Sequence, residues 1–267
     1  SMGAPQVMGI LNVTPDSFSD GGEFFDPSAA IAHGLNLINE GADMLDIGGE
    51  STRPGADEVT TQKELDRVLP VFSGLVAAGV KLPLSIDSYK AVVADQAVQS
   101  GATVINDVYG LQREPEMADV AALYKVPVVA MHWDKNRDAS KDLIAEMLRY
   151  FERTLAIADK AGIGADKLIL DPGFGFGKNL AENYELLRRL GELAELNRPL
   201  LIGTSRKSMI GKLLGNVPKE RLAGTLATSV LAYQNGGHLF RVHDVRANRD
   251  ALQVACAALY GPPEIAS

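Results

Sequence analysis

Short apolar runs alternate along the chain with longer amphipathic stretches, and polar segments containing Gly, Asp or Asn separate the two. The apolar runs carry few polar positions, as is typical of strands buried on both faces of a parallel sheet. They predict strands at residues 7–13, 43–47, 82–86, 103–106, 126–131, 168–170, 200–202 and 239–242.

The amphipathic stretches predict helices at residues 27–40, 61–78, 90–100, 117–125, 141–161, 180–190, 221–234 and 245–259. Asp26 followed by Pro27 is a helix-start signal, and a glycine directly follows four predicted helix ends, at positions 41, 79, 101 and 162. Eight strands alternating with eight helices, without a linker, predict an α/β fold: a (β/α)8 TIM barrel forming a single domain over residues 1–267. An open doubly wound sheet is the alternative, although no G-x-G-x-x-G sequence follows the first strand to support dinucleotide binding.

Composition narrows the class of protein. The 267 residues suit one barrel, since about 250 is typical of this fold. A net charge of −8 argues against a nucleic-acid partner, because such proteins present a basic face. No apolar stretch approaches the roughly 18 residues of a membrane span. The lone Cys256 cannot form an intrachain disulfide, which favours a reducing cytoplasm. Residues 1 and 2 are interpreted as an expression scar.

Polar side chains gather where the predicted strands end. Helix capping and turns would account for any single Asp or Asn there. Polar residues at all eight strand ends indicate a site, because buried carboxylates are costly without a partner and TIM-barrel active sites lie at the carboxyl ends of the strands. In strand order these positions are Asn12, Asp46, Asp87, Asn106 with Asp107, His132, Asp171, residues 204–208 and residues 241–244.

Three of these residues have the chemistry to bind a flat, nitrogen-rich ring. Asp87, Asn106 and Asp171 offer carboxylate and amide oxygens, which pair with the N–H donors of a guanidine-like edge such as that of a 2-amino-4-oxopyrimidine. Lys207 adds a donor that can reach a ring carbonyl or nitrogen. These strand ends therefore predict a pocket for such a ring.

The last strand predicts an anion pocket. Arg241 and His243 are two residues apart, so their side chains point to the same face of a strand, and Asn12 lies on the neighbouring strand of a closed barrel. Phosphate sites of this fold commonly follow strands 7 and 8. A helix that begins near Val245 would add its N-terminal dipole to the pocket.

Other motifs do not fit a known site. Residues 171–178 are rich in glycine but lack the G-x-x-x-x-G-K-[ST] spacing of a phosphate-binding loop. The four histidines show no zinc-ligand spacing. Ser205 and Ser208 lie in no nucleophile elbow.

Seven segments, in chain order, resemble the bacterial dihydropteroate synthases. They are residues 8–22, 46–55, 85–88, 105–107, 171–178, 203–208 and 241–244. The segments MGILNVTPDSFSDGG and DIGGESTRPG are long and specific, whereas SIDS alone would be weak evidence. The resemblance extends from the first predicted strand to the last and so covers nearly the whole chain.

The resemblance implies a transferase of folate biosynthesis. Such an enzyme joins 6-hydroxymethyl-7,8-dihydropterin pyrophosphate to p-aminobenzoate and releases 7,8-dihydropteroate and pyrophosphate. The resemblance also implies Mg²⁺ on the leaving group, a cytoplasmic homodimer and a target of sulfonamides. In the pterin pocket it implies binding by Asp87, Asn106, Asp171 and Lys207, with Met131 against the ring.

The remaining residue roles follow from the same resemblance. Arg241 and His243 would hold the pyrophosphate with Asn12, which would also bind the metal. Asp46 and Asp87 would favour positive charge on the pterin. Substrate contacts are further expected from two long loops and one helix start: Thr14 and Phe18, then Thr52, Arg53 and Pro54, with Phe18 and Pro54 flanking p-aminobenzoate, and Ser208 binding its carboxylate.

One segment departs from the family pattern. Members usually have Met-His-Met followed by a Gln-Gly or Arg-Gly loop, whereas this chain has MHWDKNR at residues 131–137. Trp133 is interpreted either as rim packing or as a ligand contact. Three other functions stay open at this point: a pterin-binding methyltransferase, a paralogue that binds without catalysis, and an unrelated phosphate-binding barrel.

Overall fold

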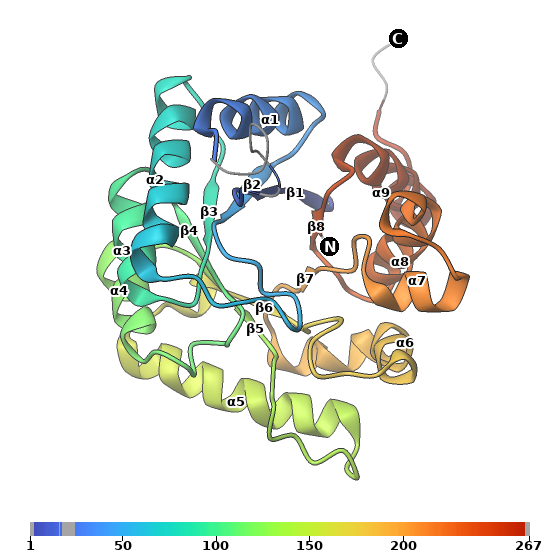
Figure 1. The fold of residues 1–267 in the computed structure, drawn as a ribbon. Helices are drawn as coiled ribbons and strands as arrows, with labels where there is room; N and C mark the ends of the chain where they lie inside the picture. The colour runs from blue at the N-terminus through green and yellow to red at the C-terminus, as the bar shows by residue number, and fades with distance from the viewer. Residues whose placement is uncertain (1–2, 16, 18–24, 265–267) are drawn as a thin grey trace.

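Eight parallel strands form the inner wall of the computed structural model, and α-helices surround them as an outer ring (Figure 1). The structure describes residues 3–15, 17 and 25–264. The strands are β1 (Gln6–Asn12), β2 (Met44–Gly48), β3 (Leu84–Asp87), β4 (Val104–Asp107), β5 (Val128–Met131), β6 (Leu168–Asp171), β7 (Leu201–Ile202) and β8 (Leu239–Val242).

The sheet closes on itself. Its neighbour order is β6-β5-β4-β3-β2-β1-β8-β7. A parallel bridge between Leu170 of β6 and Leu200, directly before β7, joins the two ends of that order. The predicted TIM barrel is therefore confirmed, and the open doubly wound sheet is wrong as an alternative.

Both ends of each predicted strand and helix fall within two residues of the ends of an observed element. An additional helix, α7, has only 7 residues, which is too short to show a helical period of apolar positions. The helices are α1 (Pro27–Asn39), α2 (Thr61–Ala77), α3 (Ala91–Gln99), α4 (Glu116–Tyr124), α5 (Leu143–Ala161), α6 (Leu180–Arg189), α7 (Ser208–Leu214), α8 (Leu222–Gln234) and α9 (Val245–Tyr260).

Local signals set the helix ends as the sequence predicts. The Asp26 side chain accepts a hydrogen bond from the backbone N–H of Ser28, and Pro27 begins α1. Gly162 ends α5 with a φ of 84°, a conformation that a residue with a Cβ adopts only at a cost. These ends determine where the chain turns back into the next strand.

Residues that point into the barrel form two layers, because side chains alternate between the two faces of a strand. Met44, Val104, Val129 and Leu239 belong to the lower layer. Two residues further along each of these strands, the side chain is polar or is that of Met131, and it faces the open end of the barrel, here called the mouth. The apolar layer closes the barrel below that mouth. It comprises Met8, Met44, Val104, Val129, Leu201 and Leu239.

A second, larger apolar core lies between the strands and the helices. It contains Leu45 and Ile47 of β2 together with Val68 and Phe72 of α2. The strands are thus buried on both faces, as their apolar sequences predict. Within the described part of the chain, no helix has the length and apolar character needed to cross a membrane.

Candidate active site

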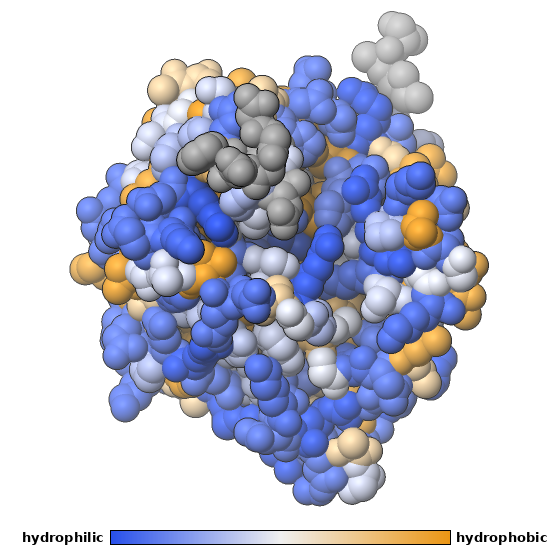
Figure 2. Space-filling model, in the orientation of Figure 1, coloured by the Kyte–Doolittle hydropathy of each residue, from blue (hydrophilic) through white to orange (hydrophobic). Residues whose placement is uncertain are grey.

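Four polar side chains form the floor of the mouth. Asp46, Asp87, Asn106 and Asp171 have exposed fractions of 0%, 7%, 3% and 6%. The register of the sheet places Asp87 beside Asn106 and Met131 beside Asp171. Figure 2 shows the face that Figure 1 presents, where hydrophilic side chains surround a hollow near the centre. The floor is therefore a buried polar surface at the carboxyl ends of the strands.

Arg241 links the floor residues. Its Nε donates to Asp46 Oδ2 at 2.7 Å, and its Nη2 donates to Asp87 Oδ2 at 3.3 Å. Asn106 Nδ2 donates to the same Asp46 oxygen at 3.1 Å. Among the described residues no hydrogen bond joins Arg241 to Asn12, because its guanidinium turns to the carboxylates that share the lumen. Its expected contact with the pyrophosphate stays a prediction.

Several buried oxygens of this cluster have no hydrogen-bond partner among the described residues. Buried polar atoms in native proteins are nearly always paired, and leaving one unpaired costs about 1–3 kcal/mol. The unpaired atoms lie on adjoining strands and comprise three acceptors and one hydroxyl. They are Asp46 Oδ1, Asp87 Oδ1, Asn106 Oδ1 and Ser85 Oγ. Their arrangement suits a ligand rich in N–H donors.

Burial raises the pKa of Asp87 and of Asp171 above the ordinary value of an aspartate. For Asp87 burial is the largest cause, the charge of Asp46 adds to it, and Arg241 opposes both. For Asp171 burial is again the largest cause, and Lys207 opposes it. Perturbed pKa values of this kind concentrate at functional sites.

Lys207 belongs to the same pocket. Its Nζ donates to the backbone carbonyl of Phe174 at 2.6 Å and lies 4.8 Å from the ring centroid of Phe176. Burial lowers the pKa of Lys207 to about 8, and the charge of Asp171 opposes this shift. Since an ammonium has three N–H donors, donors remain for a ligand carbonyl or nitrogen, as the sequence predicts.

His243 lies beside Ser205, one residue after the end of β8. Ser205 Oγ accepts a hydrogen bond from the backbone N–H of His243 at 3.1 Å and lies 2.8 Å from its Nδ1. Because a hydroxyl can both donate and accept, this contact suits either tautomer of the ring. Burial and the nearby Arg241 lower the pKa of His243 to about 3, so the ring is neutral at pH 7. Helix α9 begins at Val245, as expected.

The substrate contacts expected from the two long loops and the helix start lie at the rim of the mouth. The hydroxyls of Thr14 and Ser17 are 3.0 Å apart in an exposed setting. Phe18 lies outside the described residues. The other expected contacts are partly or fully exposed: Thr52, Arg53, Pro54 and Ser208. The structure therefore separates a buried floor from an exposed rim.

The atypical segment after β5 builds an aromatic wall beside the pocket. Trp133 stacks on Tyr109 with ring centroids 4.9 Å apart and meets Phe176 edge-on at 4.9 Å. Met131, expected against the pterin ring, is 3% exposed and belongs to the same cluster. Trp133 thus packs against aromatic neighbours at the rim, and its contact with a ligand stays a prediction.

Lys178 is a residue of the site that sequence reasoning missed. Its Nζ donates to the carbonyls of Gly173 and Phe176 at 3.0 and 3.1 Å and lies 2.9 Å from His132 Nδ1. Burial lowers the pKa of Lys178 to about 7. The available signal was the repeated glycine of this loop, where positions 173, 175 and 177 all have positive φ and turn backbone carbonyls toward one donor.

The side chains available for a metal are few. Among the described residues, no group of three or more His, Cys, Asp or Glu is arranged to hold one. Asn12 is half-buried at the end of β1, opposite Gly48 of β2. Mg²⁺ commonly takes one or two protein ligands and completes its coordination with substrate phosphates and water. A single amide oxygen at the mouth fits that pattern better than a metal centre built from protein alone.

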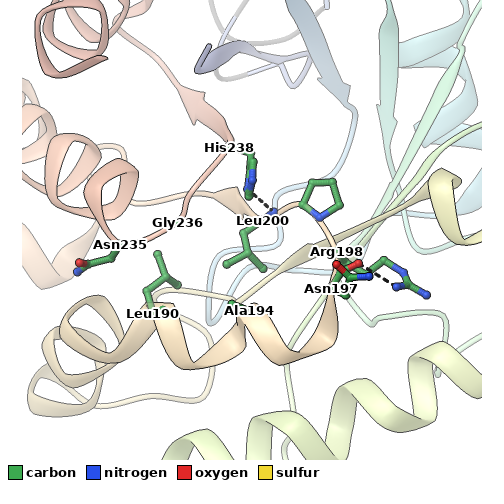
Figure 3. Close-up of a pocket in the computed structure, with 10 residues that line it drawn as sticks. Leu190, Ala194, Asn197, Arg198, Leu200, Asn235, Gly236 and His238 are labelled. Carbon is green, nitrogen blue, oxygen red and sulfur yellow. Dashed lines mark hydrogen bonds between the residues drawn. The ribbon is translucent and has the colours of Figure 1, made fainter. Parts of the chain in front are cut away.

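Two cavities lie away from the floor. One of about 400 Å³ lies at the opposite end of the barrel, around Leu190, Pro199 and His238 (Figure 3). His238 Nδ1 accepts there from the backbone N–H of Leu200 at 3.2 Å, which satisfies its acceptor. The other, of about 700 Å³, is lined by Trp133 and surface residues of α5. Neither includes a floor residue, so the unpaired acceptors locate the site.

Comparison with known proteins agrees with this chemistry. A family model described as pterin binding enzyme matches residues 8–243. Dihydropteroate synthase of Escherichia coli (strain K12) is 49% identical over 261 residues, or 96% of this chain and 92% of that protein. The structure of Xanthomonas albilineans dihydropteroate synthase with 4-aminobenzoic acid is 50% identical, with a TM-score of 0.92 over 98% of this chain and 95% of that chain. The Clostridium difficile enzyme in the presence of pteroic acid has a TM-score of 0.93 at 46% identity, over 97% of this chain and 98% of that chain.

The fold, the floor and these matches define a pterin-binding TIM-barrel enzyme. More narrowly, the chain belongs to the dihydropteroate synthase family. The methyltransferase and the unrelated phosphate-binding barrel, which the sequence alone left open, are therefore wrong as alternatives.

Proposed function

We propose that this site joins 6-hydroxymethyl-7,8-dihydropterin pyrophosphate to p-aminobenzoate, giving 7,8-dihydropteroate and pyrophosphate. The observation that carries the proposal is the set of buried, unpaired acceptors on Asp46, Asp87 and Asn106, beside Asp171 and Lys207. The related Xanthomonas albilineans enzyme has been solved with 4-aminobenzoic acid and in complex with 7,8-dihydropteroate.

The floor would bind the pterin by complementary hydrogen bonds. Oxygens of Asp87, Asn106 and Asp171 accept from the 2-amino group and ring N–H groups, and Lys207 donates to the ring oxygen or nitrogen. Met131 packs against the ring. The floor acceptors and Met131 lie at strand ends, and Lys207 lies directly before α7, so the pterin meets a surface that needs little rearrangement.

The transfer itself needs no strong base. The amine of p-aminobenzoate is unprotonated at neutral pH, so it can attack the methylene carbon of the pterin directly. A carbon–nitrogen bond forms, the carbon–oxygen bond to pyrophosphate breaks, and the amine gives up one proton. Asp46 and Asp87 share one guanidinium, and their carboxyl oxygens would stabilise positive charge that develops on the methylene.

The leaving pyrophosphate would be held by Arg241, His243 and the N-terminus of α9. Arg241 has five N–H donors and uses two of them with Asp46 and Asp87, so the others can bind phosphate oxygens. In the tautomer that carries its proton on Nε2, His243 donates to a phosphate oxygen, and the N-terminus of α9 adds its dipole. When Mg²⁺ is bound, it neutralises charge on the leaving group, and Asn12 is the residue that would hold it.

The test is pyrophosphate release by the purified protein, with Mg²⁺ and each substrate omitted in turn. Release is expected only when all three are present, and to fail in Lys207→Ala and Arg241→Ala. Tight pterin binding without release would instead identify a paralogue that binds without catalysis.

We further propose that the protein acts as a cytoplasmic homodimer. Monomeric proteins rarely expose large contiguous apolar patches, and a symmetric pair would cover such a patch. The lone Cys256 suits a reducing compartment. The patch proposed for the dimer contact consists of apolar residues of α7, α8 and the turn between them, which have exposed fractions of 38% to 60%: Leu213, Leu214, Val217, Leu222 and Leu231. Light scattering should give twice the chain mass of 28.5 kDa.

A further inference from the structure

The loop between β2 and α2, residues 49–60, begins against the floor of the site. A Cβ at Gly48 would lie 3.0 Å from Asp87 Oδ2, and one at Gly49 would lie 3.0 Å from Val68 Cγ1, so the chain leaves β2 in close contact with both the floor and α2. Thr52, Arg53 and Pro54 follow in a segment without helix or strand. Something outside this segment must therefore hold it in place.

The two ends of the loop meet on one ammonium group, that of Lys90. Its Nζ donates to Glu50 Oε2 at 3.1 Å, to the backbone carbonyl of Val59 at 2.5 Å and to Glu64 Oε2 at 2.7 Å. Glu50 lies at the start of the loop, Val59 at its end, and Glu64 on α2. An ammonium has three N–H donors, so these contacts use all of them.

Glu50 also joins the two ends of the loop directly. Its Oε1 accepts from the backbone N–H of Val59 at 3.1 Å and from Tyr89 Oη at 2.9 Å. The side chains of Glu50 and Glu64 are 5% and 1% exposed, and that of Lys90 is 12% exposed. Removing one partner from such a buried group leaves an uncompensated charge, which is strongly unfavourable.

The outer part of the loop has much weaker support. Within it, the backbone N–H of Ala56 donates to the carbonyl of Arg53 at 3.1 Å. Toward the rest of the molecule, Arg113 pairs with Glu58 at 2.9 Å, with side chains 38% and 70% exposed. Exposed ion pairs stabilise by about 0–1 kcal/mol. The position of residues 51–58 therefore depends mainly on the buried contacts at the base.

We propose that Lys90 is a positioning residue for the p-aminobenzoate half of the site, because it ties both ends of the β2–α2 loop to α2. Lys90 is not among the residues proposed to bind either substrate, and it lies three residues beyond Asp87 of the floor. The inference rests on the proposed function, since p-aminobenzoate is a substrate of that reaction and Pro54 of this loop is expected to flank its ring.

The decisive variant is Lys90→Met, which keeps the length of the side chain and removes its donors. The KM for p-aminobenzoate should rise about tenfold or more, because small misplacement of binding groups has large kinetic effects. The dissociation constant of the pterin pyrophosphate, measured by calorimetry without p-aminobenzoate, should change less than about twofold. Lys63→Met, an exposed lysine of α2, is the matched control and should change neither.

A second readout does not depend on turnover. Hydrogen–deuterium exchange of the unliganded protein should show the amide of Val59 protected in the wild type and exchanging much faster in Lys90→Met, with Lys63→Met like the wild type. If Lys90→Met fails to fold, Glu64→Gln gives the milder form of the test and should still speed exchange in residues 50–59. Unchanged exchange in that segment, or an unchanged KM for p-aminobenzoate in a variant that binds the pterin normally, would overturn the inference. Absence of turnover in the wild type would contradict the proposed function and leave the exchange result to decide on Lys90.

Discussion

The floor and the rim of the mouth are built in different ways. The floor residues sit on strands whose backbone ladder fixes them, and Asp46, Asp87, Asn106 and Asp171 are all buried. The rim residues sit on connecting segments or at the start of a helix, and Arg53, Pro54 and Ser208 are exposed. A ligand that binds the floor finds its partners in place, whereas a ligand that binds the rim depends on how the loops are held.

The floor is therefore the region of strong, fixed binding, and the rim is the region that can adapt. Unpaired buried acceptors make the floor costly to leave empty, so its geometry is matched to one kind of ring. The polar groups of the rim carry no such free-energy cost when the site is empty, because water can form hydrogen bonds with them. Substitutions at the floor should therefore have large effects, and those at the rim smaller effects confined to p-aminobenzoate.

Arg241→Met should have the largest effect. It removes donors to the pyrophosphate and leaves Asp46 and Asp87 buried without a countercharge, and we expect kcat/KM to fall about 1,000-fold. Steady-state kinetics measure this, with circular dichroism to show that the variant is folded. Arg249→Met, on the outside of the barrel, is the control and should stay near wild type. A loss of less than tenfold in Arg241→Met would remove this residue from the mechanism.

Asp87→Asn should weaken pterin binding about 100-fold, since it replaces a charged acceptor at the floor, yet stabilise the unliganded protein. The raised pKa of Asp87 means that its contribution to stability is present at acidic pH and is lost as pH rises from its ordinary value through the raised one. Asn mimics the neutral acid and loses nothing. Thermal unfolding should therefore show similar Tm values near pH 4 and a higher Tm for the variant at pH 8. A lower Tm of the variant at pH 8 would show that the Arg241 contact outweighs burial.

Pterin affinity should fall as pH rises through about 8. Burial lowers the pKa of Lys207 to about 8, and only the ammonium form is a full donor to the pterin. Each further pH unit should then reduce affinity about tenfold, as calorimetry between pH 7 and 9.5 would detect. Lys207→Arg, which stays charged over this range, should bind with a flat profile. The same steep fall in Lys207→Arg would assign the titration to another group.

Arg53→Ala should have the smallest effect of this series. Arg53 is exposed at the rim, so we expect the KM for p-aminobenzoate to rise about threefold, in line with the modest energies of exposed charged contacts. The pterin dissociation constant should not change. A change in pterin binding as large as that of Asp87→Asn would break the separation of floor from rim.

The sequence predicts most of the floor because of two regularities. Apolar runs followed by polar residues locate the strand ends, and consecutive parallel strands place Asp87 beside Asn106. The contact of Arg241 with Asp46 joins residues 195 positions apart and depends on the closure and register of the barrel, which no local pattern encodes. Likewise, the Lys90 contacts bring together a loop start, a loop end and a helix. The short α7 was missed because seven residues are too few to show a period.

The most direct test of a pterin site built on the floor is calorimetry of the pterin pyrophosphate, without p-aminobenzoate, on the wild type, Asp171→Asn and Lys90→Met. The wild type and Lys90→Met should bind with nearly equal affinity, because the rim does not hold the pterin. Asp171→Asn should bind about 100-fold more weakly, because the floor loses a charged acceptor. Wild-type affinity in Asp171→Asn, or a similar loss in both variants, would contradict a pterin site built on the floor alone.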